Sequence, residues 1–402
     1  MINLEAPKKA GALINQAYQA AAEVFRPISR KYDRAEHTYP TELDMFAALL
    51  DGLNSSGEGG AGAAGVRRNE KEADKGNRNG ANLNVVLGTI EMCWGDVGLL
   101  LTMPRQGLGN AAIASVANEE QLKRFSGIWA AMAITEPGCG SDSAAITATA
   151  RLDGDEYVLN GEKIFVTSGE RADAVVVWAT LDKTKGRAAI KSFVVEKGTP
   201  GFEVVRVEHK LGIRASDTAV LRFENCRVPK DNLLGTPEID TKKGFAGVMQ
   251  TFDNTRPLVA AMGVGVARAA LEETARILAE AGVVVDYDKP ANTQHAAAAA
   301  YLQLEADYES AYLLTLESAW MADNRKPNSL QASMAKAKAG RSVVEITLKC
   351  VELAGIVGYT EESLLEKWAR DAKILDIFEG TQQIQQLIVA RRILGKTSTE
   401  LK

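Results

Sequence analysis

The chain has 402 residues, of which 46% are hydrophobic and 25% are charged, and this composition is typical of a globular protein with two or three packed units. The formal net charge is −5, and the chain has no clustered excess of Lys and Arg of the kind that binds DNA or RNA, so we expect no nucleic-acid partner. The four cysteines and three histidines show no metal-ligand spacing, which predicts free thiols in a reducing compartment and no metal site. The N-terminal segment resembles neither a secretory signal nor a membrane anchor, so the expected location is cytoplasmic, without a membrane span.

Residues 1–127 are predicted to form a helical unit. Apolar residues recur at helical spacing over 10–53, with breaks at Pro27 and Pro40, and again over 84–103 and 110–125. The intervening segment 54–82 is rich in Gly and charge and poor in large apolar side chains. No strand precedes it and no Gly-Lys-Ser/Thr sequence closes it, so we expect a mobile surface loop and not a phosphate-binding loop.

Residues 128–236 have the pattern of a β unit. Thr, Val, Ile and Phe alternate with polar residues, and no helical stretch of useful length separates the short strands. Strands are predicted over 157–159, 164–167, 174–179, 192–196 and 220–224. The pairs Asp153-Gly154 and Asn160-Gly161 are typical of hairpin turns. We therefore expect an antiparallel β-barrel or sandwich in the middle of the chain.

Residues 237–402 return to helical spacing. Pro257 suits a first helical turn, and the apolar stripe behind it consists of Leu258, Met262, Val266 and Ala270. Long helices interrupted mainly at 286–292 and 355–359 predict a helical bundle. The fold class is therefore α+β: an N-terminal α-helical domain, a middle antiparallel β-barrel domain and a C-terminal α-helical bundle.

Two segments carry candidate chemistry. The sequence AMAITEPGCGSD (131–142) joins the helical unit to the β unit, and its Pro and Gly residues fit a plain connector and a binding loop for a polar cofactor equally well. Glu379 precedes Thr381, the predicted N-cap of a helix, where a solvated carboxylate is the more common arrangement. Burial would instead raise its pKa and suit a general base. The apolar residues that favour burial are Ile374, Leu375, Ile377 and Phe378.

Five motifs occur in an order that resembles the acyl-CoA dehydrogenase family. They are TEPGCGSD (135–142), LNGEKIFVTSG (159–169), GIRASDT (212–218), FDNTRP (252–257) and RDAKILDIFEGTQQIQQLIVAR (370–391). The first two resemble the family's flavin-binding signatures, and the last resembles its catalytic segment nearly residue for residue. Five matches in the correct order over more than half of the chain are far more specific than any single motif.

The resemblance implies FAD as the cofactor and an acyl-CoA thioester as the substrate. Glu379 would be the catalytic base that removes the α-proton, the β-hydrogen would pass to the flavin as hydride, and the product would be a trans-2-enoyl-CoA. Thr255 stands where some family members carry a second carboxylate base, so Glu379 would act alone. The flavin-binding residues would be Met132, Ile134, Thr135, Ser141, Phe165, Thr167, Thr381 and Gln383. The substrate-binding residues would be Ser141, Asp253, Arg256 and Gly380.

The resemblance also implies a role in fatty acid β-oxidation, with an electron-transfer flavoprotein as the partner that takes the electrons. Two alternatives stay open: an acyl-CoA oxidase, and a structural subunit that completes the flavin site of a partner enzyme. The family's Arg-x-x-Phe-Gly element is replaced within 279–294, and its Gln and Gly-Gly positions hold Glu352, Gly355 and Ile356. We therefore expect either a homotetramer, with residues such as Lys289 replacing the lost contacts, or a heterotetramer with a paralogous subunit.

Overall fold

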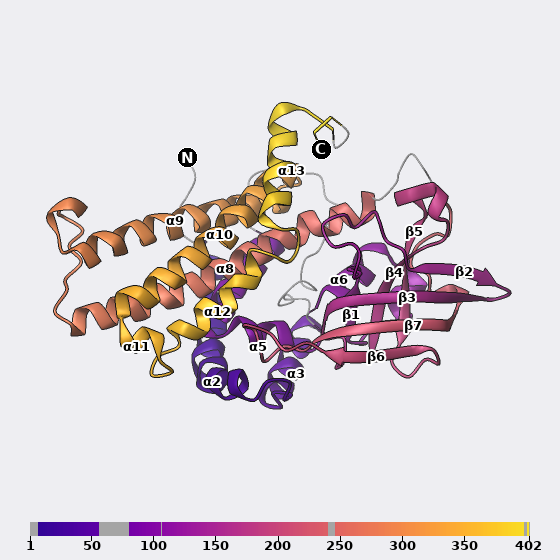
Figure 1. The fold of residues 1–402 in the computed structure, drawn as a ribbon, viewed down its shortest axis with the longest axis horizontal. Coiled ribbons are helices and arrows are strands. Elements are labelled where there is room, and N and C mark those ends of the chain that lie inside the picture. The colour runs from indigo at the N-terminus through magenta and orange to yellow at the C-terminus, as the bar shows by residue number, and fades with distance from the viewer. Residues whose placement is uncertain (1–6, 56–79, 106, 240–245, 398–399, 402) are drawn as a thin grey trace.

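The computed structural model describes residues 7–55, 80–105, 107–239, 246–397 and 400–401, with only the backbone described for 49–55 and 246–254. Figure 1 shows the long helices α8, α9 and α10 on one side, the sheet on the other, and the N-terminal helices beside both. This arrangement confirms the predicted α+β class with helical N-terminal and C-terminal units around a β unit. The predicted domain limits at 127/128 and 236/237 stay predictions.

The N-terminal helices are largely continuous from residue 8 to residue 55. They are a 3-10 turn (Lys8–Ala10), α1 (Gly11–Ala20), a π-helical turn (Ala21–Phe25), α2 (Arg26–Arg34) and α3 (Glu42–Ser55). The predicted break at Pro27 is wrong, because the chain stays helical through it: Pro27 is the second residue of α2, which directly continues the π-helical turn. Of the predicted loop 54–82, residues 54–55 end α3 and residues 81–82 begin α4, while 56–79 lie outside the described residues.

The remaining helices of this unit lead toward the sheet. They are α4 (Ala81–Gly95), α5 (Val97–Thr102), α6 (Leu108–Val116) and α7 (Glu119–Arg124). Asp96 begins α5 as its N-cap and accepts the Leu99 N–H at 2.8 Å. Asn118 and Gln121 form a reciprocal capping box on α7.

The middle unit is one curled sheet of seven strands. They are β1 (Ala130–Ala133), β2 (Thr149–Asp153), β3 (Glu156–Thr167), β4 (Ala174–Thr180), β5 (Ile190–Glu196), β6 (Phe202–Val207) and β7 (Thr218–Pro229). The path runs β1-β4-β2-β3-β7-β6, with β5 also on β4. Most pairs are antiparallel as predicted, but β1 pairs with β4 in parallel and β2 meets β4 in parallel at one residue pair. The parallel pairs follow from the long connections that bring these strands to β4.

The two predicted hairpin turns have different outcomes. Asp153 and Gly154 do connect β2 to β3, with Asp153 opposite Glu156. The turn predicted at Asn160-Gly161 is wrong, because β3 continues through it and the register against β7 shifts between Leu159 and Gly161. Gly161 has φ of 149°, and a Cβ there would lie 2.6 Å from the Ala148 side chain. The glycine therefore serves a bulge and a close approach, not a reversal of the chain.

The C-terminal unit consists of long helices. They are α8 (Ala246–Glu280), α9 (Ala296–Asp323), α10 (Ser329–Ala354), α11 (Ile356–Tyr359), α12 (Leu365–Leu375) and α13 (Gln382–Leu394). The prediction that Pro257 begins a helix is wrong, since α8 starts at Ala246 and passes through it. Leu258 and the residues after it are buried, and this packing outweighs the hydrogen bond that a proline removes. Gly265 lies against the Ile90 carbonyl of α4, so the absence of a side chain allows α8 and α4 to pack closely.

The first and last units share a hydrophobic core. It includes Phe25 before α2, Leu99 of α5, Val266 of α8 and Trp368 of α12, each at most 1% exposed. A separate core fills the curled sheet. No helix within the described ranges is both long enough and apolar enough to cross a lipid bilayer. The helices of the first and last units thus form one packed body that includes α12.

Candidate active site

Glu379 lies in the short turn between α12 and α13. Its φ is +56° and that of Gly380 is +89°, so two successive residues adopt the left-handed region. This conformation costs a non-glycine residue about 1–3 kcal/mol, and such strain persists only where neighbouring contacts hold it. Thr381 is the N-cap of α13 and accepts the Ile384 N–H at 3.4 Å, as predicted from the sequence.

The Glu379 carboxylate faces the start of the buried part of α8. Thr255 is 2% exposed, and its hydroxyl donates to Glu379 Oε2 at 3.1 Å. Arg256 is 3% exposed, and its guanidinium contacts the Ser333 hydroxyl of α10 at 3.5 Å. Burial raises the pKa of Glu379, while the Thr255 hydroxyl and the charges of Arg256 and Lys336 partly oppose the rise. The arrangement is that of a protein base with raised proton affinity.

Lys336 of α10 was not predicted as a site residue, yet it lies directly beside this turn. It is fully buried, and its ammonium donates to the Gly380 carbonyl at 2.6 Å. Burial lowers the pKa of Lys336 to about 8, against the opposing charges of Asp376 and Glu379. A lysine within a helix, 43 residues before the base, gives no local signal, because only the packing of α10 on α12 brings the two segments together.

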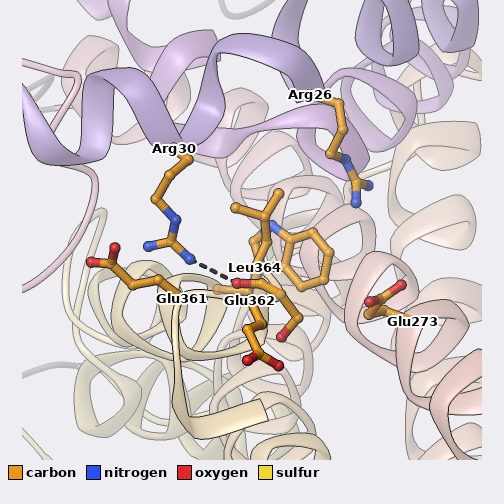
Figure 2. A pocket seen from close by; sticks show the side chains of 8 residues that line it. Arg26, Arg30, Glu273, Glu361, Glu362 and Leu364 are labelled. Carbon is orange, nitrogen blue, oxygen red and sulfur yellow. Dashed lines mark hydrogen bonds between the residues drawn. The ribbon is translucent and has the colours of Figure 1, made fainter. Parts of the chain in front are cut away.

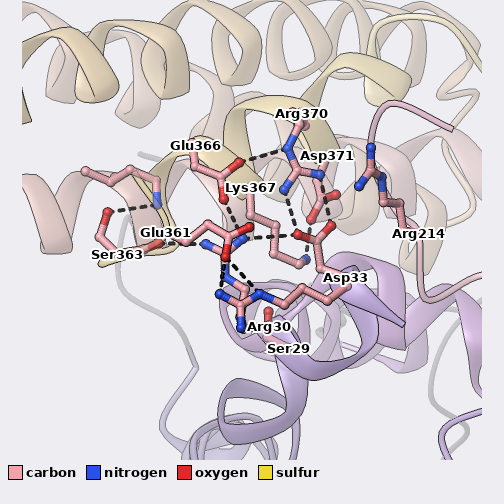
Figure 3. A network of polar contacts seen from close by, with 12 residues as sticks. Ser29, Arg30, Asp33, Arg214, Glu361, Ser363, Glu366, Lys367, Arg370 and Asp371 are labelled. Atoms are coloured by element: carbon pink, nitrogen blue, oxygen red, sulfur yellow. Dashed lines mark hydrogen bonds and ion pairs between the residues drawn. The ribbon is translucent and has the colours of Figure 1, made fainter. Parts of the chain in front are cut away.

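A buried ion pair network fixes α12, the helix that leads into Glu379. Lys367 is 2% exposed, and its ammonium bonds Asp96 Oδ2 at 2.7 Å and Asp371 Oδ2 at 2.5 Å. Figure 3 shows Lys367, Arg370 and Asp371 projecting from α12 among residues of α2. The charges of Asp371 and Asp96 outweigh the burial of Lys367 and raise its pKa.

Further contacts of α12 reach two other units. Arg370 bonds Asp33 of α2 at 2.6 Å, and the pair is drawn in Figure 3. Asp371 Oδ1 accepts the Ile213 N–H at 2.5 Å, and Gly212 lies against the Arg370 backbone, where a Cβ would overlap it. The GIRASDT motif (212–218) therefore has a structural role here: it fixes α12 and, through α12, the turn that carries Glu379.

A second group of predicted residues lies on the sheet. Met132 is on β1, Ile134 and Thr135 follow it, and Thr167 ends β3; all four are half-buried. The Thr135 carbonyl accepts the Ile164 N–H at 2.9 Å, which joins the loop after β1 to β3. The two flavin-type motifs, far apart in sequence, are thus brought together at one edge of the unit.

This loop is held by a buried pair that sequence reasoning missed. Glu136 is 4% exposed; its carboxylate bonds Lys163 Nζ at 2.8 Å, the Thr147 hydroxyl at 2.6 Å and the N–H groups of Thr147 and Ala148 at 2.7 and 3.0 Å. Burial alone would raise the pKa of Glu136, but Lys163 and the hydrogen bonds of Thr147 bring it below its usual value. The opposite charges within the two motifs were the signal that could have revealed the pair.

Phe165 has the chemistry expected beside a flat apolar group. It lies on β3 with φ of +56°, a conformation that is unusual for a bulky residue, and 62% of its surface is exposed. An aromatic ring held outward at this cost, next to the half-buried Thr167, fits the face of a flavin ring system. Polar groups suited to the rest of such a cofactor include the exposed Ser141 and Gln383 and the half-buried Thr381. The residues present therefore fit FAD.

Gly380 and Asp253 are two further residues that were predicted to bind the substrate. Gly380 is half-buried, and its carbonyl accepts from both Lys336 and, at 3.4 Å, Gln385. Asp253 lies on α8 just before Thr255, among residues whose side chains fall outside the described part of the structure. The structure thus gathers Arg256, Gly380 and Glu379 around one turn, and leaves the contribution of Asp253 as a prediction.

A cavity of about 350 Å³ lies apart from the Glu379 turn (Figure 2). Its lining consists of Arg26, Arg30, Glu273, Glu361, Glu362, Ser363, Leu364 and Trp368. The Arg26 guanidinium stacks between Trp94 and Trp368, at 3.9 and 4.6 Å from the ring centroids. Arg30 donates to the Ser363 carbonyl at 2.7 Å, as Figure 2 shows. None of these residues was predicted for the site. The charged side chains pair with residues outside the lining: Arg30 with Asp33 and Glu366, Glu273 with Arg276, and Glu361 with Arg34.

Glu36, His37 and His209 also come together, with possible ligand atoms within 4.8 Å of one another. No spacing in the sequence predicts this cluster, because His37 and His209 belong to different units. His209 Nδ1 lies 3.0 Å from Glu36 Oε2, Glu36 Oε1 accepts the Lys210 N–H at 2.9 Å, and His37 Nε2 lies 3.0 Å from the Glu208 carbonyl. These hydrogen bonds account for the cluster without an ion, and the expectation of no metal site stays a prediction.

Comparisons with known proteins agree on one family. Models of the acyl-CoA dehydrogenase middle domain and C-terminal domain match residues 131–226 and 242–394. The short-chain specific mitochondrial acyl-CoA dehydrogenase of Rattus norvegicus is 40% identical over 272 residues, covering 65% of this chain and 62% of that protein. The cyclohex-1-ene-1-carbonyl-CoA dehydrogenase of Geobacter metallireducens is 38% identical over 282 residues, covering 69% of this chain and 72% of that protein.

The fold comparison covers nearly the whole chain. The structure of butyryl-CoA dehydrogenase from Megasphaera elsdenii matches with a TM-score of 0.82 at 28% identity, over 98% of this chain and 100% of that chain. The sequence match to the rat relative spans less than two thirds of that protein's length. The two domain models together cover more than half of the chain and include the Glu379 turn. The chain therefore belongs to the acyl-CoA dehydrogenase family.

Proposed function

We propose that this chain is an FAD-dependent acyl-CoA dehydrogenase in which Glu379 removes the α-proton of an acyl-CoA thioester. The observation that carries this proposal is the Glu379 turn itself: a carboxylate of raised pKa, held in a left-handed conformation beside Thr255 and Arg256. A structural carboxylate would be expected to form a close ion pair, as Glu136 does with Lys163. Glu379 instead accepts one hydroxyl hydrogen bond and keeps a strained backbone, which is typical of a functional group.

The roles of the chain's own residues follow from the reaction. The carboxylate of Glu379 takes the α-proton, and the electron pair of the broken α-C–H bond becomes part of the new α,β double bond as the β-hydrogen leaves as hydride. FAD, when bound, supplies the acceptor for that hydride. Arg256 and Gly380 would contact the thioester end, as would Asp253 of the FDNTRP motif. Glu379 itself is half-buried, and the partial removal of its carboxylate from water strengthens its interactions.

The flavin would be held by the sheet edge and by the start of α13. Met132, Ile134, Thr135, Phe165 and Thr167 would contact its ring system. Polar contacts to its remaining parts would come from Ser141, Thr381 and Gln383. The N-terminus of α13 supports the last two assignments, because N–H groups in a first helical turn favour negatively charged groups.

The proposal is tested by Glu379→Gln, which keeps the size of the side chain and removes the base. The purified variant should retain its yellow flavin and its midpoint of thermal unfolding, and it should lose about 10²–10⁴-fold or more in the rate of anaerobic flavin reduction by an acyl-CoA. Butyryl-CoA is the first substrate to try, since relatives are named as short-chain enzymes, followed by longer and branched acyl-CoAs. Near-normal flavin reduction by the variant would falsify the assignment.

The electron acceptor is proposed to be an electron-transfer flavoprotein, as the family resemblance implies. The chain carries no NAD-binding fingerprint: its Gly263-Val264-Gly265 lies inside α8 and serves helix packing. Turnover should therefore require a flavoprotein acceptor and produce no NADH. Stoichiometric peroxide without that acceptor would support the oxidase alternative, and a purified chain without any flavin would support the structural-subunit alternative.

The assembly is proposed to be a tetramer, either of identical chains or with a paralogous subunit. Glu352 is exposed and ion-paired to Lys349 at 2.5 Å, and Ile356 is 73% exposed at the start of α11. These are the positions where the family has residues that serve a neighbour's flavin. Lys289, which could replace a lost contact, bonds Asp286 at 3.0 Å and remains exposed. Expression alone and with a paralogous family subunit, with measurement of mass and flavin content, separates the two. One tightly held FAD per chain in a homotetramer excludes the heteromer.

A further inference from the structure

Among the described residues, three lysines have fully buried side chains, and their partners differ. Lys163 bonds the Glu136 carboxylate, and Lys367 bonds those of Asp96 and Asp371. Lys336 instead directs its ammonium at a backbone carbonyl, that of Gly380, at 2.6 Å. Burying an ammonium is costly and normally requires a carboxylate partner, so the placement of Lys336 calls for another reason.

The position of Lys336 is set by an unusually close approach of two helices. Gly340 lies one turn later on the same face of α10, and a Cβ there would come within 2.7 Å of the Leu375 carbonyl at the end of α12. Because a larger residue would push the helices apart, this glycine brings α10 against the segment that continues into Glu379. Lys336 consequently reaches the turn from a rigid helix.

A second donor, from α13, also bonds the carbonyls of this turn. Gln385 of α13 is fully buried, and its side-chain amide donates to the Glu379 carbonyl at 2.9 Å and to the Gly380 carbonyl at 3.4 Å. Both carbonyls of the left-handed pair are thus bonded, one by Gln385 alone and one by Gln385 and Lys336. Without such bonds the strained turn would relax toward an ordinary conformation.

We propose that Lys336 is a positioning residue for Glu379: with Gln385, it holds the carbonyls of the left-handed Glu379-Gly380 pair and so fixes the direction of the catalytic carboxylate. The inference rests on the proposed role of Glu379 as the base. A carboxylate displaced by about 1 Å can lose about 10²-fold in rate even when the substrate still binds, so a rigid turn matters for catalysis.

The charge of Lys336 adds an effect that a purely structural lysine would lack. Among the described side chains, the charged groups around the Glu379 carboxylate are Arg256 of α8 and Lys336 of α10. Asp376 at the end of α12 faces Lys336 and is itself paired with Lys373 at 3.2 Å and Arg341 at 3.7 Å. Removal of the Lys336 cation favours the protonated form of Glu379. The acidic limb of the rate profile should then move to higher pH.

The test compares Lys336→Met, Lys336→Arg and the control Lys338→Met in anaerobic flavin reduction by butyryl-CoA over a range of pH. Lys338 lies on the same helix but pairs with Asp307 at 2.5 Å, away from the turn, so its variant should match the parent enzyme. Lys336→Met should reduce the maximal rate about 10–100-fold with little change in substrate affinity, and should move the acidic limb to higher pH. Lys336→Arg should restore the limb and part of the rate, because it keeps the charge and donors.

An unchanged maximal rate and an unchanged acidic limb in Lys336→Met overturn the proposal. If Lys336→Met does not fold or does not bind flavin, the same measurement is made on Gln385→Met. A lower rate of flavin reduction with an unchanged acidic limb supports the proposal that Lys336 and Gln385 together hold the turn, and a rate equal to that of the parent overturns it. Glu379→Gln is measured in the same series. Its normal activity would mean that the proposed base is wrong, whereas its inactivity beside a fully active Lys336→Met would mean that only the positioning role is wrong.

Discussion

Thr255 donates its hydroxyl hydrogen to Oε2 of Glu379 across 3.1 Å, from the buried part of α8 to the turn before α13. The two residues are 124 positions apart, and the contact exists only because α8 and the α12–α13 turn pack against each other. A hydroxyl that donates to a carboxylate favours its ionised form, so Thr255 keeps the base available for proton removal. This relationship gives a direct test of the site.

Thr255→Val removes the donor and preserves the shape of the side chain. The pKa of Glu379 should rise further, because the hydrogen bond that favours its ionised form is lost, and flavin reduction at mildly acidic pH should slow. At higher pH, where Glu379 is ionised in both proteins, the rates should converge. Thr255→Ser keeps the hydroxyl and should follow the parent profile. Identical pH–rate curves for the valine and serine variants would show that the 3.1 Å contact has no influence on the base.

The parent enzyme should itself show an acidic limb above the range of an ordinary glutamate. Burial raises the pKa of Glu379, and only its ionised form accepts the α-proton, so the rate of flavin reduction should increase as pH rises through that pKa. The effect on stability has the opposite sign. A folded pKa above the unfolded value stabilises the fold below the unfolded pKa, and this contribution is lost as pH rises through the folded pKa.

The stability effect is measured by the difference in unfolding midpoint between the parent and Glu379→Gln. The glutamine does not titrate, so the parent's midpoint should fall relative to that of the variant as pH increases. If the parent's unfolding midpoint instead rises relative to that of the variant as pH increases, the fold stabilises the ionised form of Glu379 and not the protonated form.

The fold was largely predictable because its units differ in periodicity. Helical spacing and β alternation separate cleanly along this chain, and Thr381 was recognised as an N-cap from its side chain alone. The errors arose where packing overrides a local rule. Pro257 lies inside α8 because the helix around it is buried, and Gly161 forms a bulge because Ala148 leaves no room for a side chain. Neither the burial of the helix around Pro257 nor the approach of Ala148 to Gly161 can be predicted from the residues next to them in the sequence.

The catalytic motifs of the site were predictable from their resemblance to a family, but the residues that support them were not. Glu379 and Arg256 were found through that resemblance, since a solvated carboxylate is the more common arrangement at the position of Glu379. Lys336 and Gln385 were missed, because a buried helical lysine and a first-turn glutamine have no local pattern that distinguishes them from surface residues. Their role follows only from the distances to the two carbonyls of the turn.

Gly380→Ala should impair both stability and catalysis. At φ of +89° a Cβ is strained, and it would overlap the buried amide of Gln385, displacing the donor that holds the Glu379 carbonyl. We expect a loss of about 1–3 kcal/mol in unfolding free energy and a marked fall in the rate of flavin reduction. Gly127→Ala is the matched control, because Gly127 has φ of +81° with open space around its Cβ position. Equal losses of stability and rate in the two variants would contradict a special role for the Gly380 contact.

Lys367→Met should destabilise the chain more than any comparable loss of a surface lysine. The ammonium of Lys367 lies between the buried carboxylates of Asp96 and Asp371, and its removal leaves two acidic groups close together without a cation. Breaking a buried pair in this way typically costs about 3–5 kcal/mol. Asp371 also accepts the Ile213 N–H, so repulsion between the carboxylates would disturb the contact that joins α12 to the middle unit.

The control is Lys349→Met. Lys349 pairs with Glu352 on the exposed surface of α10, where such ion pairs contribute about 0–1 kcal/mol to stability. Urea unfolding of both variants, with flavin content measured in parallel, gives the comparison. Because α12 leads directly into the Glu379 turn, Lys367→Met should also release flavin or lose activity at urea concentrations below those that unfold the whole chain. If the variant instead keeps its activity until it unfolds in a single step, the network stabilises the core without positioning the site.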